Sequence, residues 1–514
     1  MTLPTLPDSD APPLFSEFGI IETMRAHFSR FIQQAFGYGA GMVLNRFAGF
    51  VLVPIYTRLL SPADYGALDV VTTFSTMVTI FVFLGLDSAV IRFFFDTDDP
   101  AHQARVMGTG FWTVLAWTGL LTTLALLFAG PLARLAGNPA YERYLRIALL
   151  TIPFTVLHSF QLVMLRVRFD LARYNALAIS NLIAGAGLSV TLVAILRMGV
   201  MGILLGVLCG YVLTSAIGLW LNWRTIGPWS RPLLAPLLAM GLPLLPASLA
   251  YWVLGYSDRL FLSHLVAPAQ IGLYAVANKL VSALALITTT FQTAWGPFSY
   301  SIAAREGALR TYAKALTYYT FVTLGAGLAL GIFAPEILAV FTRPLYVAAA
   351  PSVALLTYAI FANGCYYLVA TGVNLAKKSA HIGWTTMVAA AVNTLLNILL
   401  IPRWGILGAA TATGIGYLSS AVILYHVAQR VYPIPYEGRK LATIFGLQAA
   451  LMTTGVLFDT GSVWANASLK SGLLLAYPLL LWLTRCFDAW EVRLIAQALR
   501  QPRRLLGWVG GRPQ

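Results

Sequence analysis

Long apolar stretches run through this chain, and short polar segments separate them. A helix that crosses the hydrocarbon core of a membrane needs about 20 mainly apolar residues, and about fourteen stretches approach or exceed that length. Their approximate limits are 35–57, 66–91, 107–129, 145–165, 175–196, 200–222, 242–263, 271–295, 315–334, 351–374, 382–401, 405–429, 441–458 and 471–486. The pattern predicts an all-α polytopic membrane protein with about 14 transmembrane helices.

The composition supports this prediction and excludes a soluble globule. Of the 514 residues, 58% are hydrophobic and 10% are charged, whereas soluble proteins carry about 25% charged residues. The net charge of +15 does not indicate nucleic acid, because the basic residues form short clusters between apolar runs. Three cysteines without a CxxC pair or a nearby His predict neither a disulfide nor a metal site. The acids and prolines near the start do not fit a cleaved signal peptide, so we expect the first span to remain as an anchor.

The basic residues also indicate how the chain crosses the membrane. With the N-terminus in the cytoplasm, 23 of the 34 Lys and Arg residues fall on the cytoplasmic side, 8 on the far side and 3 within spans. Membrane proteins concentrate positive charge in their cytoplasmic loops. We therefore predict an even number of crossings with both termini in the cytoplasm.

Two short patterns each occur twice, and both recur 206 residues later. The first is Pro-Ala-x-x-Gly at 62–66 and 268–272, and the second is Arg-x-Gly-x-x-Gly followed by Gly-Tyr, at 197–211 and 403–417. A shared separation indicates a duplication, with chance matching among abundant Gly and Ala as the alternative. Six predicted spans separate each pair, so both halves point the same way. This predicts parallel repeats related by a pseudo-twofold axis along the membrane normal, with a cleft between them.

The repeats and the linkers divide the chain into six predicted parts. They are a cytoplasmic N-terminal segment (1–34), an N-lobe of six spans (35–222), a cytoplasmic linker (223–241), a C-lobe of six spans (242–429), an appended helix pair (430–486) and a basic cytoplasmic tail (487–514).

Two segments carry a resemblance to a known family. Residues 53–66 (VPIYTRLLSPADYG) and parts of 258–280, DRLFL and IGLYAVANKL, are similar to Wzx-type lipid-linked oligosaccharide flippases of the multidrug/oligosaccharidyl-lipid/polysaccharide exporter superfamily. The resemblance covers roughly residues 35–486. It implies two six-helix lobes in a V around a cavity, in a bacterial inner membrane. It also implies that an undecaprenyl-pyrophosphate-linked oligosaccharide passes from the cytoplasmic to the periplasmic leaflet by alternating access.

Basic residues inside spans are candidates for binding such a pyrophosphate, because guanidinium forks match phosphate oxygens two at a time. Arg46 lies near the middle of the first span and is the main candidate, with a structural pair to Asp87 or Asp258 as the alternative. Lys279 and Arg259 lie nearer span ends, so they either line the cavity or reach the interface. At the offset of 206, Arg46 corresponds to Trp252 and Lys279 to Thr73, which predicts a cavity that is asymmetric in charge.

Acidic and uncharged polar residues within spans form two further candidate groups. Asp258 and Asp87 are candidates for coupling to H⁺ or Na⁺, with capping, interfacial placement or mutual neutralisation as the alternatives. The uncharged group would line a hydrated sugar path or join helices through hydrogen bonds. It consists of His158, Gln161, Asn181, Asn393 and Asn397.

The sequence favours a transporter over an enzyme. No GxxxxGK[ST] motif is present, and we expect no cofactor, so an ion gradient, the membrane potential or product consumption would drive transport. The far-side loops are short and leave no obvious place for a catalytic carboxylate pair, which disfavours a glycan polymerase or ligase. A related exporter of a peptidoglycan lipid precursor, or a drug/cation antiporter, is the alternative. The expected partners are the lipid-linked glycan, membrane lipids and a polysaccharide polymerase, and not nucleic acid.

Overall fold

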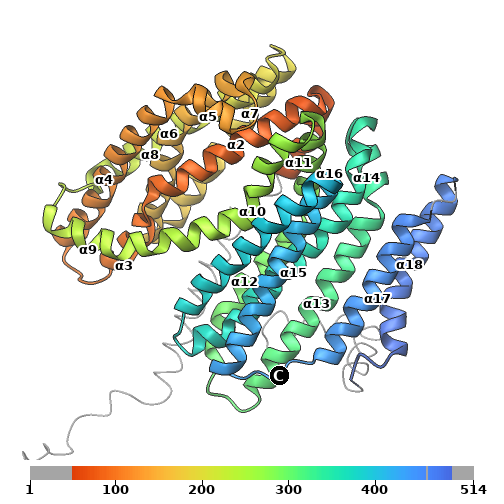
Figure 1. Cartoon of the computed structure of the whole chain (residues 1–514). Coiled ribbons are helices and arrows are strands. Elements are labelled where there is room, and N and C mark those ends of the chain that lie inside the picture. Colours follow the sequence, from red (N-terminus) through yellow and green to blue (C-terminus); the bar gives the residue numbers. More distant parts are fainter. Residues whose placement is uncertain (1–48, 459–460, 489–514) are drawn as a thin grey trace, which may run out of the picture.

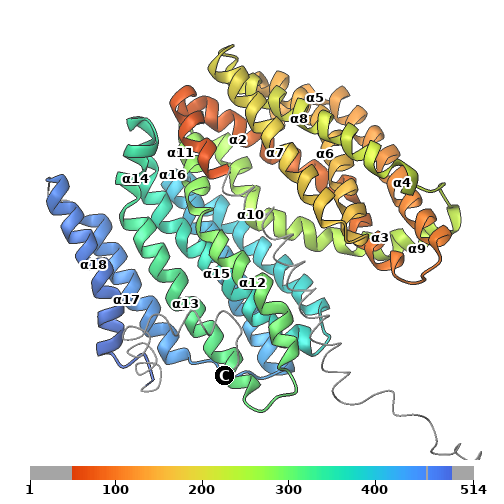
Figure 2. The same cartoon turned by 180° about the vertical axis from the view of Figure 1, so that it is seen from behind.

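The computed structural model describes residues 49–458 and 461–488, and every regular element in these ranges is a helix. Two groups of helices meet at one end and diverge toward the other, and a helix pair packs outside the second group (Figure 1). The view from behind shows the same divergence (Figure 2). This confirms the predicted all-α membrane fold.

The N-lobe begins with a short apolar helix over Gly49–Leu59. Its further helices are α2 (Pro62–Phe83), α3 (Leu86–Phe94), α4 (Pro100–Leu127), α5 (Ala129–Leu135), α6 (Glu142–Val167), α7 (Leu171–Ala194) and α8 (Gly199–Asn222), with 3-10 turns η1 (Pro139–Tyr141) and η2 (Trp223–Thr225). The connection to the second lobe contains α9 (Arg231–Gly241) and η3 (Leu242–Leu244). The predicted linker is therefore partly helical.

The C-lobe consists of α10 (Leu245–Leu265), α11 (Pro268–Val281), α12 (Leu284–Ser301), α13 (Ala308–Ile332), α14 (Ala334–Phe341), η4 (Pro344–Ala349), α15 (Ala350–Leu375) and α16 (Ala380–Val431). The appended pair is α17 (Gly438–Leu457) and α18 (Val463–Leu483), which extends a buried apolar cluster from α13 and α15. The predicted limits of the six parts remain predictions.

The count of fourteen spans is not confirmed. Within the described residues, ten helices are long and apolar enough to cross a membrane, or eleven if the bent pair α11 and α12 forms one span. The first predicted stretch, 35–57, lies mostly outside the described residues. The count is also lower because the 52-residue helix α16, which covers two predicted stretches, is counted as one span.

Helix α16 contains two antiparallel segments rather than one long rod. Gly405 interrupts it with φ 54° and ψ −128°, and the Asn393 side chain donates to the Ala412 carbonyl at 3.1 Å. On a straight helix these two residues would be about 28 Å apart, at 1.5 Å per residue. The contact requires a hairpin at Gly405, between the predicted stretches 382–401 and 405–429.

The lobes join where the two copies of the Pro-Ala-x-x-Gly pattern meet. A Cβ on Gly66 would lie 2.2 Å from the Pro268 carbonyl oxygen, and a Cβ on Gly272 would lie 1.8 Å from the Pro62 carbonyl oxygen. The contact is reciprocal, as expected for residues beside a twofold axis. A continuous buried cluster joins both lobes around this point.

Local sequence fixes the start of α2 beside this junction. The Ser61 hydroxyl accepts from the Asp64 amide at 3.1 Å, while the Asp64 carboxylate accepts from the Ser61 amide, and Pro62 occupies the first helical position. This capping box satisfies amides that a helix start leaves unpaired. It anchors the helix that carries Asp69, two turns further on, into the candidate site.

Candidate functional site

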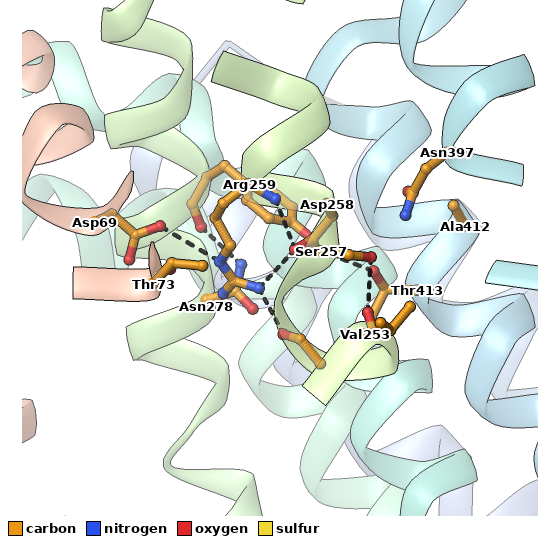
Figure 3. Close-up of polar contacts among 12 residues, drawn as sticks. Asp69, Thr73, Val253, Ser257, Asp258, Arg259, Asn278, Asn397, Ala412 and Thr413 are labelled. Carbon is orange, nitrogen blue, oxygen red and sulfur yellow. Dashed lines mark hydrogen bonds and ion pairs between the residues drawn. The ribbon is translucent and has the colours of Figure 1, made fainter. Parts of the chain in front are cut away.

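A buried arginine joins the two lobes. Arg259 on α10 is 5% exposed, and its Nε lies 3.3 Å from Oδ2 of Asp69 on α2 (Figure 3). Its Nη1 lies 2.8 Å from Oδ1 of Asp258 and also donates to the Gly255 carbonyl at 2.7 Å. One guanidinium therefore contacts two carboxylates, one from each lobe. The Arg259 side chain does not extend to the membrane–water interface, because two carboxylates compensate its charge within the protein.

Asp258 is the most enclosed charge of this group, at 1% exposed. Its Oδ1 accepts from the Arg259 side chain and from the Arg259 amide at 2.9 Å. Its Oδ2 accepts from the hydroxyls of Tyr274 on α11 and Thr413 on α16, the latter at 3.1 Å. A fully hydrogen-bonded carboxylate is the form in which a buried charge persists. Asp258 thereby ties three C-lobe helices together.

A chain of neutral side chains continues from Asp258 into α16. Ser257 contacts Asn393, whose carbonyl oxygen accepts from the Asn397 side chain at 3.1 Å. The side-chain amide oxygen of Asn397, Oδ1, is buried and has no hydrogen-bond partner among the described residues. Asn393 thus joins the two segments of α16 and contacts α10, whereas Asn397 bonds Asn393 on the same helix, and the predicted sugar-path role of both is untested.

Aromatic side chains flank the arginine on α10. Trp252 donates from Nε1 to Thr76 on α2 at 3.0 Å, and it stacks on Tyr256 with ring centroids 6.2 Å apart. The Arg259 guanidinium lies over the rings of Tyr256 and Tyr274, at 5.4 and 5.3 Å. Contacts between α2 and α10 therefore extend from Asp69 to Thr76, about two turns.

A second polar group lies between α10 and α15. The Tyr251 hydroxyl accepts from the Asn363 side chain at 3.3 Å and from the Tyr367 hydroxyl at 3.4 Å. Tyr251, Tyr256 and Tyr367 are each exposed, at 39%, 43% and 38%. Three exposed aromatic rings, the bonded hydroxyls of Tyr251 and Tyr367, and a neighbouring amide form a surface suited to sugar hydroxyls and ring faces.

The other predicted charged residues lie apart from this arrangement. Lys279 is exposed in the last turn of α11 and has no ion pair within the described residues. Asp87 lies half-buried in the first turn of α3 and has no ion pair within the described residues. Arg46 lies outside the described residues, so its predicted role stays a prediction.

The polar residues predicted in the N-lobe contact neighbouring helices. Gln161 on α6 donates to the Ser215 carbonyl of α8 at 3.0 Å, and Asn181 on α7 accepts from Thr214 of α8 at 3.2 Å. His158 packs edge-on against Tyr211 with centroids 5.5 Å apart. These contacts fit the alternative in which such side chains join helices. They are separate from the Arg259 network.

The candidate residues named from the sequence did not include Asp69, Tyr274 or Thr413. The signal for Asp69 was its place in an apolar stretch, where an acid requires a partner. The described residues contain no group of three His, Cys, Asp or Glu side chains that could hold a metal ion. The ion pair between Asp69 and Arg259 can hold the two lobes together. The Arg259 guanidinium can also bind another anion in place of Asp69.

Solved structures with this fold include a lipid flippase and a drug transporter. Lipid II flippase MurJ in an inward closed conformation matches with a TM-score of 0.70 and 14% identity, over 87% of this chain and 98% of that chain. A multidrug resistance MATE family transporter of the MOP superfamily, inward-facing, matches with a TM-score of 0.59 and 16% identity, over 75% and 94%. At these identities the likeness establishes the fold. The protein is a multi-pass membrane protein with the fold of the multidrug/oligosaccharidyl-lipid/polysaccharide exporter superfamily.

The sequence comparison identifies the family. The chain belongs to the polysaccharide biosynthesis protein family, whose profile matches residues 55–351, more than half of the chain. Succinoglycan biosynthesis transport protein ExoT of Rhizobium meliloti is 35% identical over 104 residues, 20% of each chain. An uncharacterized membrane protein of Methanocaldococcus jannaschii is 28% identical over 209 residues, 37% of this chain and 38% of that protein. The matches thus span only about a fifth to two fifths of these relatives. The family match confirms the resemblance to polysaccharide flippases.

Proposed function

We propose that the protein flips an undecaprenyl-pyrophosphate-linked oligosaccharide repeat unit from the cytoplasmic to the periplasmic leaflet of a bacterial inner membrane. The product would supply O-antigen, capsule or exopolysaccharide synthesis. The family match over residues 55–351 supports a role in polysaccharide synthesis, and the fold supports transport rather than catalysis. In this proposal both termini are cytoplasmic, so the lobes meet at the periplasmic end and diverge toward the cytoplasm.

The observation that carries the proposal is the ion pair between Asp69 and Arg259, which crosses from one lobe to the other. Alternating access moves the lobes relative to each other around a central site. Opening at the end where the lobes now meet would separate α2 from α10 and break this pair. The pair therefore favours the present conformation while Arg259 lacks another anionic partner.

A pyrophosphate is an anionic partner that a guanidinium binds through two parallel hydrogen bonds. When it replaces Asp69 at Arg259, it releases the N-lobe from the C-lobe, and the exposed Lys279 adds a point charge beside it. Arg46 would supply a further cation. The glycan would lie against Tyr251, Tyr256 and Tyr367, whose rings and hydroxyls suit sugars.

The energy source in this proposal is electrical or ionic, since the chain has no P-loop. An inside-negative potential of 100 mV contributes about 2.3 kcal/mol for each negative charge that moves outward. Asp258 is the first candidate for proton coupling, because its carboxylate bonds the arginine that would bind substrate. Asp87 is a second candidate, and a polysaccharide polymerase is an expected partner that would remove the product.

A liposome assay tests the proposal. Purified protein is reconstituted with a fluorescent polyprenyl-pyrophosphate oligosaccharide, and a membrane-impermeant reagent measures how much label becomes accessible from the opposite leaflet. We expect protein-dependent exposure of unmodified substrate, and much slower exposure with Arg259→Gln. Cleaved or lengthened glycan would indicate a membrane enzyme. Export of a hydrophobic cation without lipid movement would indicate the related antiporter.

A further inference from the structure

A cavity away from the lobe junction lies between the C-lobe and the appended pair. Its volume is about 370 Å³, and its lining comes from the end of α13, the start of α14, η4, the start of α15, the end of α17 and the first half of α18. These elements gather at one end of the molecule, the same end at which the lobes meet (Figure 1).

Two opposite charges line this cavity. Lys470 on α18 is one of the most buried cations of the described chain, with 7% of its side chain exposed, and its ammonium donates to Oε1 of Glu336 on α14. The other carboxylate oxygen, Oε2, is buried and accepts no hydrogen bond from the described residues. A buried carboxylate oxygen without a donor is costly, more so than a neutral group. A ligand with an N–H or O–H group would give Oε2 the donor that the described residues do not provide.

The charges suit a ligand that carries both signs. An anion alone would meet Glu336, and a cation alone would meet Lys470. A zwitterion satisfies both, with its anionic group on the ammonium and its N–H donor on Oε2. Lys470 has three N–H donors, and within the described residues only Glu336 takes one, so two remain for an anionic group.

The surroundings indicate that this zwitterion is part of a lipid. Ile332, Val347 and Val456 line the cavity beside the charges. Leu457, Phe458 and Trp464 at the same end are 74%, 64% and 84% exposed. Apolar and aromatic surface at the ends of transmembrane helices faces lipid and its headgroup layer. The acyl chains of a lipid would cover this surface while its headgroup enters the cavity.

We propose that this cavity binds the headgroup of phosphatidylethanolamine, with the phosphate on Lys470 and the ammonium on Oε2 of Glu336. Phosphatidylcholine has the same charges, but its quaternary ammonium has no N–H to donate to Oε2. Selectivity between the two lipids is the signature of the site. The lipid would fill the gap between α14 and α18 and fix the appended pair on the C-lobe, independently of the transport proposal.

Native mass spectrometry of the full chain tests the inference. Detergent-purified protein is mixed with equal amounts of phosphatidylethanolamine and phosphatidylcholine that have identical acyl chains, and the retained lipid is measured. One charge-assisted hydrogen bond predicts about tenfold preference for phosphatidylethanolamine. Soluble phosphoethanolamine forms a second arm, and we expect it to compete only weakly because it lacks acyl chains.

Variants connect the selectivity to the site. Glu336→Gln should bring the ratio of the two lipids close to one. The double variant Glu336→Gln with Lys470→Gln avoids leaving a buried charge unpaired, and it should lower retention of both lipids. Glu142→Gln is the matched control, because Glu142 pairs with Arg146 on exposed surface. Equal retention of both lipids by the natural chain would overturn the proposal, because the site would then not select for an N–H donor. A ratio unchanged by either variant would also overturn the proposal.

Discussion

Gly66 of α2 and Gly272 of α11, which are 206 residues apart, pack against each other where the lobes meet. A Cβ on Gly66 would lie 2.9 Å from the Gly272 amide nitrogen, and one on Gly272 would lie 3.1 Å from the Gly66 amide nitrogen. Equivalent residues of two repeats touch only beside the axis that relates them. The duplicated pattern therefore forms the contact between the lobes, where glycine permits the backbones to approach closely.

Replacing Gly272 with alanine should open this junction. The added methyl would lie 1.8 Å from the Pro62 carbonyl oxygen, which is backbone and cannot move alone. Overpacking of this kind costs about 1 to 3 kcal/mol, which shifts a two-state ratio by about 5- to 150-fold. Spin labels at the exposed Leu59 and Leu345, with Cys209 replaced by serine, should report longer distances in Gly272→Ala.

Gly119→Ala is the matched control for this experiment. Gly119 lies in α4, and a Cβ there would have no heavy atom within 4 Å. The control should keep the distance distribution of the parent protein. If Gly272→Ala also kept it, close approach of the glycines would not limit the position of the lobes.

Removing one member of the Asp69, Arg259 and Asp258 network should have graded effects on stability. Arg259→Ala leaves the enclosed Asp258 without its cation and should destabilise by about 3 to 5 kcal/mol. Asp69→Asn leaves Arg259 paired with Asp258, so we expect a smaller loss of about 1 to 3 kcal/mol. Thermal unfolding in detergent measures both variants.

A double-mutant cycle isolates the contact between the lobes. Asp69→Asn, Arg259→Gln and the double variant should give a coupling energy of at least about 1 kcal/mol. The exposed pair Arg92 and Asp96 provides the control, for which a cycle should give about 0 to 1 kcal/mol. Additive effects of Asp69 and Arg259 would mean that the ion pair does not hold the lobes.

The sequence predicts the positions of most spans, but not the points at which a helix is interrupted within a span. The predicted stretches 145–165 and 351–374 lie within α6 and α15, because apolar length alone defines a membrane helix. The stretch 66–91 is broken at Leu84 and Gly85, where a Cβ on Gly85 would lie 2.4 Å from the Gly241 carbonyl oxygen. This break depends on a contact with a residue 156 positions away, which no local pattern reveals.

The candidate site was only partly predictable for the same reason. Arg259 and Asp258 are conspicuous as charges in an apolar stretch. Their partners Asp69, Tyr274 and Thr413 come from three other helices, and the pairing depends on which helices are neighbours. The 206-residue repeat predicted two parallel lobes, but not that α2 of one would pack against both α10 and α11 of the other.

Gly405 should be intolerant of substitution because of its backbone conformation. Its φ of 54° with ψ of −128° lies where residues with a side chain are strained by about 1 to 3 kcal/mol. Gly199, at the equivalent place in the first repeat, also has a positive φ, of 57°. Gly405→Ala should lower the thermal unfolding temperature, whereas Gly414→Ala, with open space around its Cβ, should not. Equal unfolding temperatures for both variants would show that the hairpin does not require glycine at position 405.

Asp488 should fix the segment after α18 with little pH dependence near neutrality. It accepts from Lys314 of α13 at 2.6 Å and from Lys440 of α17 at 2.8 Å, and Glu437 also contacts both lysines. The hydrogen bonds from Lys314 and then Lys440 hold the pKa of Asp488 well below its usual range. A carboxyl with a lowered pKa stabilises the fold above its unfolded pKa, about 3.9, and this contribution disappears as the pH falls through the folded pKa.

Hydrogen exchange of peptides that cover residues 484–488 measures this contribution. The protection lost in Asp488→Asn should be the same at pH 8 and pH 5, after correction for intrinsic exchange rates, and should decline only below about pH 4. Asp98→Asn is the control, because Asp98 is exposed and has no ion pair within the described residues. If the difference between the parent protein and Asp488→Asn disappeared between pH 8 and pH 5, a group that titrates near neutrality would control the segment. The two lysines would then not be its main anchor.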